Sequence, residues 1–139
     1  MADEKQKEIL SLPIREGEEP WTEEEIAEVR AELIEDVERM GKAVEAAEAE
    51  LNQLMDSGAD GNGRDPADVG SSNYERDQGV SLAHNVRGLY EQSQLARSLL
   101  ESGKYGYCEV CGEPIGKARL QAFPRATLCV ACKQREERR

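Results

Sequence analysis

Apolar side chains recur every three or four residues along a stretch near the start of the chain. The pattern begins just after Thr22 and ends near Ser57 and Gly58, so it predicts one long helix with a narrow apolar seam of the coiled-coil kind. At about 1.5 Å per residue, this helix is on the order of 50 Å long. Its seam comprises Ile26, Val29, Leu33, Val37, Met40, Val44, Ala47, Leu51 and Leu54.

The expected start of this helix carries three separate signals. Thr22 and Glu25 have the spacing of a capping box, in which each side chain accepts a hydrogen bond from the other residue's backbone N–H. Trp21 and Ile26 occupy the two positions of a hydrophobic staple. The acids of residues 23–25 lie in the first turn, where the helix dipole favours negative charge. We therefore expect Thr22 to be the N-cap residue of this helix.

A second periodic segment follows and ends at Gly103. Its seam positions are Leu82, Val86, Leu89, Ser93, Ala96 and Leu100. Between the two periodic segments lie residues 57–72, SGADGNGRDPADVGSS, whose four glycines and one proline break helices. Two helices of similar length joined by such a loop predict an antiparallel coiled-coil hairpin over residues 21–103, with residues 57–72 as its tip.

The composition limits how the chain is stabilised. Its 139 residues include one Trp, one Phe and four Tyr, and 34% of them are charged, which leaves too little apolar material for a large globular core. Residues 1–20 show no sustained periodicity and predict a flexible N-terminal arm. No stretch approaches the roughly 20 apolar residues that span a bilayer, and the first residues lack a secretory pattern. We therefore expect a cytoplasmic protein with no membrane association.

Charge is distributed unevenly along the chain. The formal net charge is −11; residues 1–103 carry 25 acids against 10 bases, whereas residues 104–139 carry 4 acids against 8 bases. The long N-terminal part should repel nucleic acid, and the C-terminal part tolerates it. This distribution argues against a protein that coats DNA, and we expect no direct sequence-specific DNA binding.

The strongest chemical signal is the set of four cysteines, Cys108, Cys111, Cys129 and Cys132. Two C-x2-C pairs separated by seventeen residues predict two knuckles that hold one metal ion between four thiolates. Gly112 follows the first pair, where such a knuckle favours positive φ. Residues 104–139 are thus expected to form a four-cysteine zinc finger and a C-terminal helix, with one structural Zn²⁺ that leaves no open position for catalysis.

Other uses of these cysteines fit less well. Disulfides suit a secreted chain, and a redox C-x-x-C pair normally opens a helix in a βαβ setting that this sequence lacks. Iron in a rubredoxin-like site uses similar knuckles, so the spacing alone leaves iron open. The lone His84 has no second ligand type at helical spacing, and we interpret it as a solvated helix residue.

The segment GYCEVCGEPIGKARLQAFPRATLCVACK, residues 106–133, resembles the zinc finger of the DksA/TraR family of bacterial RNA polymerase-binding transcription factors. The resemblance runs from about residue 22 to residue 135. It implies a mainly α fold, in which a long antiparallel coiled-coil hairpin precedes a small C-terminal four-cysteine zinc-finger domain. It also implies a monomeric, non-enzymatic regulator whose coiled coil enters the secondary channel of RNA polymerase, so that the tip modulates initiation complexes.

The tip motif of this family is Asp-x-x-Asp-x-Ala. Asp65 and Asp68 match its two acids, whereas Gly70 replaces the alanine and removes a methyl group. Two carboxylates at this tip can act electrostatically near the Mg²⁺ of the polymerase active centre.

Some members of this family bind the alarmone ppGpp at a site that they form jointly with polymerase, so the resemblance raises the question of whether this chain does so. Lys133 matches one cation of that site, but Phe123 and Gln92 stand where those members have arginine and lysine. Phosphates need charge-assisted partners, so we expect at most a weak response to ppGpp. Arg119 and Arg125 are further basic residues of the finger that are candidates for polymerase or ligand contact.

The sequence is also compatible with two other functions. A Gre-like transcript cleavage factor also places tip acids in the secondary channel, but Gre factors are not known for a four-cysteine finger. A zinc finger that binds nucleic acid through Arg119, Arg125, Lys133 and Arg135 is the other alternative. Four thiolates around one Zn²⁺ carry about −2, which halves the local positive charge of that finger.

Overall fold

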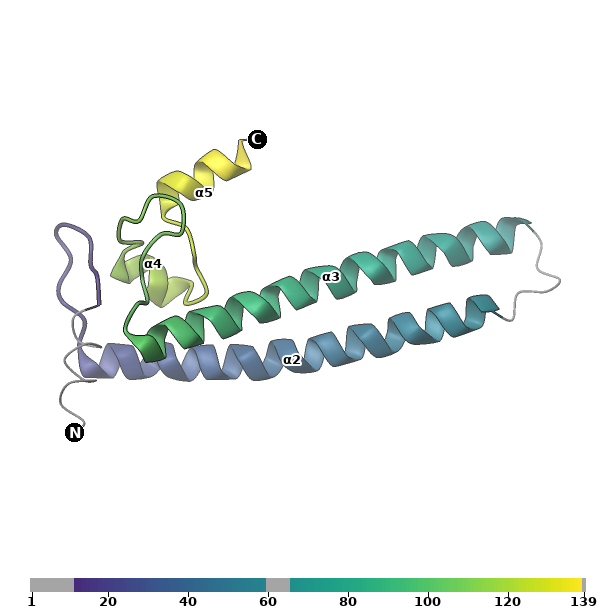
Figure 1. Cartoon of the computed structure of the whole chain (residues 1–139), viewed down its shortest axis with the longest axis horizontal. Helices are drawn as coiled ribbons and strands as arrows, with labels where there is room; N and C mark the ends of the chain where they lie inside the picture. The colour runs from purple at the N-terminus through teal and green to yellow at the C-terminus, as the bar shows by residue number, and fades with distance from the viewer. Residues whose placement is uncertain (1–11, 60–65, 139) are drawn as a thin grey trace. The chain divides into compact units, whose positions relative to one another are not determined.

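The computed structural model describes residues 12–59 and 66–138, apart from the side chains of residues 57–59, 66–69 and 72. Four helices, labelled in Figure 1, follow one another along these residues: α2 (Glu23–Ala59), α3 (Pro66–Ser102), α4 (Lys117–Ala122) and α5 (Val130–Glu137). Within the described ranges there is no β-strand, only one isolated bridge between Tyr107 and Pro114. The predicted mainly α fold is confirmed.

The chain divides into two compact units. We call Met1–Asp36 together with Gln92–Arg139 the finger unit, and Val37–Glu91 the hairpin unit. The predicted boundary after residue 103 therefore does not coincide with a boundary between compact units. None of the helices in the described part of the chain is long and apolar enough to cross a membrane.

The start of α2 has the predicted capping box. The Thr22 backbone N–H donates to Glu25 Oε1 at 3.0 Å, and the Glu25 N–H donates to Thr22 Oγ1 at 3.2 Å. Trp21 and Ile26, the predicted staple pair, are both buried in one apolar cluster. These interactions satisfy N–H groups that have no partner within the helix and fix the direction in which the chain enters it.

The α3 seam residues Ser93, Ala96 and Leu100, which belong to the finger unit, are buried as predicted. In the hairpin unit, α2 buries its predicted seam, whereas α3 turns mostly other residues than the predicted ones toward α2. Val44 and Ala47 of α2 are buried, but Leu82 and Leu89 of α3 are exposed rather than in the seam. A methyl group at Gly79 would lie 3.2 Å from Leu54 Cδ1, so this glycine faces α2. The half-buried positions of α3 in this unit are Arg76, Gly79, Ala83, Val86 and Tyr90.

Small residues explain this difference. The Leu54 and Leu51 side chains occupy the space that a side chain at position 79 would fill, and the Tyr90 ring likewise lies 3.3 Å from where a methyl group at Gly41 would be. Glycine on one helix therefore receives a large side chain from the other, which keeps the contact close-packed. A pattern search that counts only apolar side chains misses this arrangement.

The predicted loop, residues 57–72, is longer than the segment that separates the two long helices. Helix α2 continues to Ala59, and α3 already begins at Pro66 and includes Gly70. Proline fits the first position of a helix because its φ is preset and its missing N–H would have no partner there. A glycine inside a helix costs only about 1 kcal/mol relative to alanine, so Gly70 alone does not end the helix.

One apolar core holds the finger unit together. Leu33 of α2, Leu100 of α3 and Leu120 of α4 are fully buried in it, so the ends of both long helices pack with the finger. Tyr105 adds a buried hydroxyl that donates to the Pro124 carbonyl oxygen at 2.7 Å, and burial raises the pKa of this hydroxyl. The remaining members of the core cluster are Leu12, Trp21, Ile26, Val29, Ala96, Cys108, Ile115, Cys129 and Cys132.

Residues 12–20 are packed, contrary to the flexible arm expected over residues 1–20. Leu12 is buried, and the Trp21 indole N–H donates to the Pro13 carbonyl oxygen at 3.2 Å. A methyl group at Gly106 would lie 3.0 Å from Pro13 Cγ, which shows how closely this segment meets the finger. We call residues 12–21 the N-terminal strap; residues 1–11 lie outside the described part of the chain.

Candidate functional site

The four cysteines of the finger meet at one point. Their Sγ atoms all lie within 4.8 Å of one another, and the Sγ atoms of Cys111 and Cys129 are 3.7 Å apart. The sulfurs of Cys108, Cys129 and Cys132 belong to buried residues, whereas Cys111 is exposed. The four cysteines that the sequence predicts as metal ligands therefore lie together.

Local backbone geometry sets each pair of sulfurs. After the first pair, the Gly112 N–H donates to the Cys108 carbonyl oxygen at 3.0 Å, and Gly112 has the expected positive φ, 74°. Cys129 is the N-cap residue of α5, so this helix carries Cys132. The Glu109 N–H donates to the Thr127 carbonyl oxygen at 2.9 Å and ties the two knuckles together.

The thiols differ strongly in acidity. Burial works against the Cys108 thiolate, but N–H groups of Cys111, Cys129 and Val110 outweigh it and lower the Cys108 pKa to about 6. A hydrogen bond with the Cys129 sulfur, together with burial, raises the Cys132 pKa to about 12. Four neighbouring thiols cannot all ionise by themselves, and a divalent cation is what allows four thiolates to coexist at this spacing.

The spacing of the sulfurs fits a tetrahedral metal site. With metal–sulfur bonds of about 2.3 Å, tetrahedral geometry places neighbouring sulfurs about 3.8 Å apart, close to the 3.7 Å between Cys111 and Cys129. The donor set is four soft sulfurs, which selects Zn²⁺ or iron over hard cations such as Mg²⁺ or Ca²⁺. All four positions are filled by protein, so the arrangement suits a structural ion.

The strap supplies the N-cap that α4 lacks. Gly116 precedes this helix and has no side chain to cap it. Instead, Glu18 of the strap accepts hydrogen bonds from the backbone N–H of Lys117 at 3.0 Å and of Ala118 at 2.9 Å. Desolvation opposes ionisation, but these N–H groups and that of Arg15 lower the Glu18 pKa. A carboxylate distant in sequence thus stabilises the helix between the two knuckles.

Lys117 connects α4 to the start of α2. Its Nζ lies 2.7 Å from Glu25 Oε1, 6.0 Å from the centre of the Trp21 ring, and 3.3 and 3.4 Å from two carbonyl oxygens of the strap. This ammonium is the largest cause that lowers the Glu25 pKa, to about 2. Sequence patterns do not reveal this network, because its partners are about a hundred residues apart along the chain.

Two of the three predicted basic contact residues have partners within the finger unit. The Arg119 Nε donates to the Leu128 carbonyl oxygen at 3.2 Å, and its guanidinium lies 5.8 Å from the centre of the Phe123 ring. The Arg125 Nε lies 3.8 Å from Asp36 Oδ2. Lys133 is exposed on α5. The three residues therefore do not form one open basic surface.

The predicted tip residues are described only in part. Asp65 lies outside the described residues, and Asp68 lies in the first turn of α3 with no described side chain. Gly70 is helical and exposed, and a methyl group added there would meet no atom within 4 Å. The absence of a side chain at position 70 is therefore not required by neighbouring atoms in the described part of the chain.

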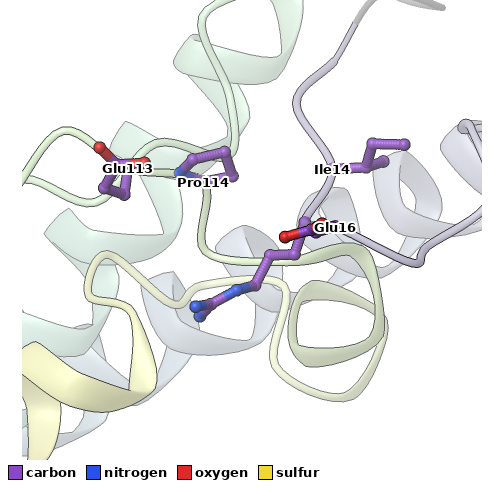
Figure 2. Close-up of a pocket in the computed structure, with 5 residues that line it drawn as sticks. Ile14, Glu16, Glu113 and Pro114 are labelled. Carbon is purple, nitrogen blue, oxygen red and sulfur yellow. The ribbon is translucent and has the colours of Figure 1, made fainter.

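An open groove of about 440 Å³ lies between the strap and the loop after the first knuckle. Figure 2 shows Ile14 and Glu16 on the strap side and Glu113 and Pro114 on the loop side. Arg15 completes its lining. The groove combines two carboxylates with one guanidinium and contains none of the four cysteines, but it borders the first knuckle, because the Glu113 carbonyl oxygen accepts the Cys108 N–H at 2.8 Å.

Comparison with known proteins gives consistent similarities. The family model described as the prokaryotic dksA/traR C4-type zinc finger matches residues 103–138. In three dimensions, the chain is similar to the transcription factor DksA2 from Pseudomonas aeruginosa, with a TM-score of 0.64 and 30% sequence identity. That match covers 84% of this chain and 85% of the other.

Curated relatives match in sequence over shorter stretches. The RNA polymerase-binding transcription factor DksA of Caulobacter vibrioides is 44% identical over 78 residues, which is 56% of this chain and 55% of the relative. The protein of the same name from Escherichia coli is 35% identical over 69 residues, 50% of this chain and 46% of the relative. The chain thus spans about half the length of the curated relatives it matches.

Proposed function

The chain belongs to the DksA/TraR family, and from this membership we propose that it regulates transcription by binding bacterial RNA polymerase, without enzymatic activity of its own. The observation that carries the proposal is the structural match over 84% of the chain to a transcription factor at 30% identity. The curated relatives are named RNA polymerase-binding factors, which supports polymerase as the partner.

In this proposal the four cysteines hold one Zn²⁺ that stabilises the finger. The sulfur spacing and the C4-type family model support this role. Metal analysis of the purified protein should find one zinc per chain and no iron. A red protein with iron–thiolate absorption would instead assign the site to iron.

The hairpin unit enters the secondary channel of polymerase, and Asp65 and Asp68 act at its end as the effector pair. Their negative charge works near the Mg²⁺ of the active centre and changes the stability of initiation complexes. The protein acts as a cytoplasmic monomer and makes no sequence-specific contact with DNA.

Response to ppGpp is weak or absent in this proposal. Gln92, which stands in place of a lysine, donates its side-chain N–H to the Arg125 carbonyl oxygen at 2.8 Å. The nearby Arg125 guanidinium faces the carboxylate of Asp36, and Phe123 carries no charge. A phosphate-rich ligand would thus meet few cations that are not already compensated. Tight binding of ppGpp that requires both this chain and polymerase would contradict this part.

The first experiment compares the wild type with Asp65→Asn/Asp68→Asn in polymerase binding and run-off initiation. A matched control is Asp56→Asn/Asp77→Asn, because these exposed aspartates also belong to the hairpin unit and their replacement changes the net charge equally. We expect all three proteins to bind, and only the tip variant to lose its effect on initiation. Equal loss in both variants would assign the effect to net charge rather than to the tip.

The same preparations test the two alternatives. Stimulated cleavage of backtracked transcripts that is lost in Asp65→Asn would indicate a Gre-like factor. Binding of nucleic acid without polymerase would favour the zinc-finger alternative, but Arg119 and Arg125 already have partners within the finger unit. No binding to polymerase at all would refute the main proposal.

A further inference from the structure

One side of α3 in the hairpin unit is exposed and uncharged. Six residues define this surface, which we call the neutral face: Tyr74, Gln78, Ser81, Leu82, Asn85 and Leu89, all of them exposed. Tyr74, Leu82 and Leu89 leave 66%, 49% and 39% of their surface accessible. At about 100° per residue, these positions fall on one side of the helix, next to the side that meets α2.

The absence of charge here is unusual for this chain. In the sequence as a whole 34% of residues are charged, yet from Gln78 to Tyr90 the only charged side chain is Arg87, with His84 taken as neutral. Arg87 lies outside the neutral face, and its guanidinium forms an ion pair with Glu48 of α2. Two acids, Glu75 and Asp77, border the face near the start of α3.

The opposite helix of the same unit has the reverse character. The exposed surface of α2 in this unit carries Glu38, Arg39, Lys42, Glu45, Glu50 and Asp56. This charged surface stays hydrated at little cost, whereas burying it against a partner would remove water from several carboxylates at once. One unit thus presents a charged side suited to water and a neutral side suited to contact.

The chemistry of the neutral face selects a protein as its partner. Nucleic acid requires cations for its phosphates, and none of the six residues is basic. Interfacial membrane binding requires a broad apolar surface flanked by lysine or arginine, which two leucines and a tyrosine do not provide. Protein interfaces are depleted of charge at their centre and enriched in aromatic residues, with amides and hydroxyls for hydrogen bonds.

We propose that the neutral face of α3 is the side through which the hairpin unit contacts the protein surface of RNA polymerase, with the charged side of α2 left in water. This inference rests on the proposed function, because it names the contact surface of that same partner. Leu82 and Tyr74 supply the apolar contact, and Gln78, Ser81 and Asn85 supply hydrogen bonds around it. Three apolar side chains among three amide or hydroxyl side chains, with no charge, match the composition that protein interfaces have at their centre.

Two double variants test the inference by placing the same charges on either helix. Gln78→Lys/Asn85→Lys alters the neutral face, and Asn52→Lys/Gln53→Lys introduces the same residues at exposed positions of α2 in the same unit. Both pairs change the net charge equally, so long-range attraction to polymerase changes equally. Circular dichroism and the thermal midpoint check that each variant keeps its fold.

We expect the α3 pair to weaken polymerase binding at least tenfold and the α2 pair to change it less than twofold. A third variant, Leu82→Ser, removes apolar area without adding charge and should weaken binding severalfold. Equal effects of the two pairs, or no effect of the α3 pair while the wild type binds, would overturn the inference and leave the proposed function standing. A wild type that does not bind polymerase would overturn both.

Analytical ultracentrifugation of the free protein tests whether a second copy of this chain, rather than polymerase, binds to the neutral face. We expect one monomeric species for the wild type and for both pairs. A wild-type dimer that only the α3 pair dissociates would overturn the inference, because the neutral face would then be a self-association surface.

Discussion

Glu25 takes part in three stabilising interactions at once. Its Oε1 accepts the Thr22 N–H of the capping box and pairs with Lys117, while its Oε2 accepts the Gln121 side-chain N–H at 2.8 Å. Because these partners favour the carboxylate, they hold the Glu25 pKa near 2, below its ordinary value of 4.5. The charge of one side chain thus links the start of α2 to α4.

Stability should therefore depend on pH through Glu25. A pKa that is lower in the folded state gives stabilisation that is complete above about 4.5 and is lost as the pH falls toward about 2. Glu25→Gln keeps a capping-box residue but removes the charge. We expect urea denaturation to show a less stable variant at pH 7, with a difference from the wild type that shrinks below about pH 4.5.

As a control for this comparison, the metal content of the wild type and of Glu25→Gln must be equal at each pH, because acid also protonates the cysteines. A difference that stays constant down to pH 3 would mean that the charge of Glu25 is not the source of the stabilisation.

Gly106 is a residue that no other amino acid can replace without rearrangement. Its φ is 103°, and a methyl group there would lie 3.0 Å from Pro13 Cγ and 3.4 Å from Leu120 Cδ1. Gly106→Ala should cost about 1–2 kcal/mol for the left-handed backbone and about 1–3 kcal/mol more for overpacking. Gly17→Ala is the matched control, because φ there is 87° but the space is open. Equal losses of unfolding free energy in the two variants would show that the strap does not press on Gly106.

Individual residues differed in how well the sequence predicted them. The local hydrogen bonds of Thr22, Glu25 and Gly112 were predictable because donor and acceptor lie within four residues along the chain. Glu18 was not, because its partners are the backbone N–H groups of Lys117 and Ala118, which tertiary packing alone brings within reach. Sequence patterns for helix capping describe hydrogen bonds between residues close in sequence, so they do not predict a cap that comes from a distant segment.

At the scale of elements, the inward side of α2 was predictable, whereas that of α3 was predictable only toward its end, where Ser93, Ala96 and Leu100 are buried as expected. The seam of α2 consists of large apolar side chains, whose spacing reveals it directly. In α3 the inward positions include Gly79 and Ala83, whereas Leu82 and Leu89 remain exposed. Where a helix packs a glycine against leucines of its neighbour, its own sequence has no apolar side chain to mark the contact. Its inward side becomes clear only once the neighbour is in position.

The first turns of α3 offer a test of how helix stability affects the tip. Gly70→Ala should stabilise the helix by about 0.5–1 kcal/mol, because alanine favours helix and a methyl group there meets open space. Gly88→Ala is the control, since position 88 is equally open and lies outside the tip motif. We expect both variants to raise the thermal midpoint, and only Gly70→Ala to strengthen the effect on run-off initiation. An equal gain of activity in both would assign that gain to helix stability alone.

Removal of metal should affect the finger unit more than the hairpin unit. Without a cation the four sulfurs lose the interaction that holds the knuckles together, and structural zinc is worth roughly 10–16 kcal/mol in small fingers. A strong chelator should make four thiols per chain reactive toward a thiol reagent. Hydrogen exchange should accelerate in α4 and α5 and stay slow around Val44 and Ala47 of α2. Equal acceleration in both units would mean that the metal site supports the whole chain.

At the scale of the whole molecule, charge limits the choice of partner. Residues 1–103 carry an excess of 15 acids, and the excess of 4 bases in residues 104–139 is about halved by four thiolates around one Zn²⁺. If the proposed function holds, a protein with this charge balance would reach polymerase through protein surface rather than through DNA. Its acidity therefore agrees with a role in transcription that involves no duplex contact.

This charge balance predicts poor binding to free DNA. At about 0.15 M salt we expect the full chain to bind duplex DNA more weakly than the range of about 10⁻⁴ to 10⁻⁶ M that is typical of nonspecific DNA-binding proteins. Fluorescence anisotropy with a labelled duplex at several salt concentrations measures this. Micromolar binding with a steep salt dependence would contradict the prediction and favour a nucleic-acid-binding finger.

The strap also gives the protein a built-in spectroscopic probe. Trp21 is the single tryptophan of the chain. Its buried indole donates a hydrogen bond to the Pro13 carbonyl oxygen, and the centre of its ring lies 6.0 Å from the Lys117 ammonium. Biosynthetic incorporation of 5-fluorotryptophan would place one ¹⁹F nucleus at this junction. Its resonance would report whether the strap stays seated or lifts away when polymerase binds, without interference from the many unlabelled tryptophans of the enzyme.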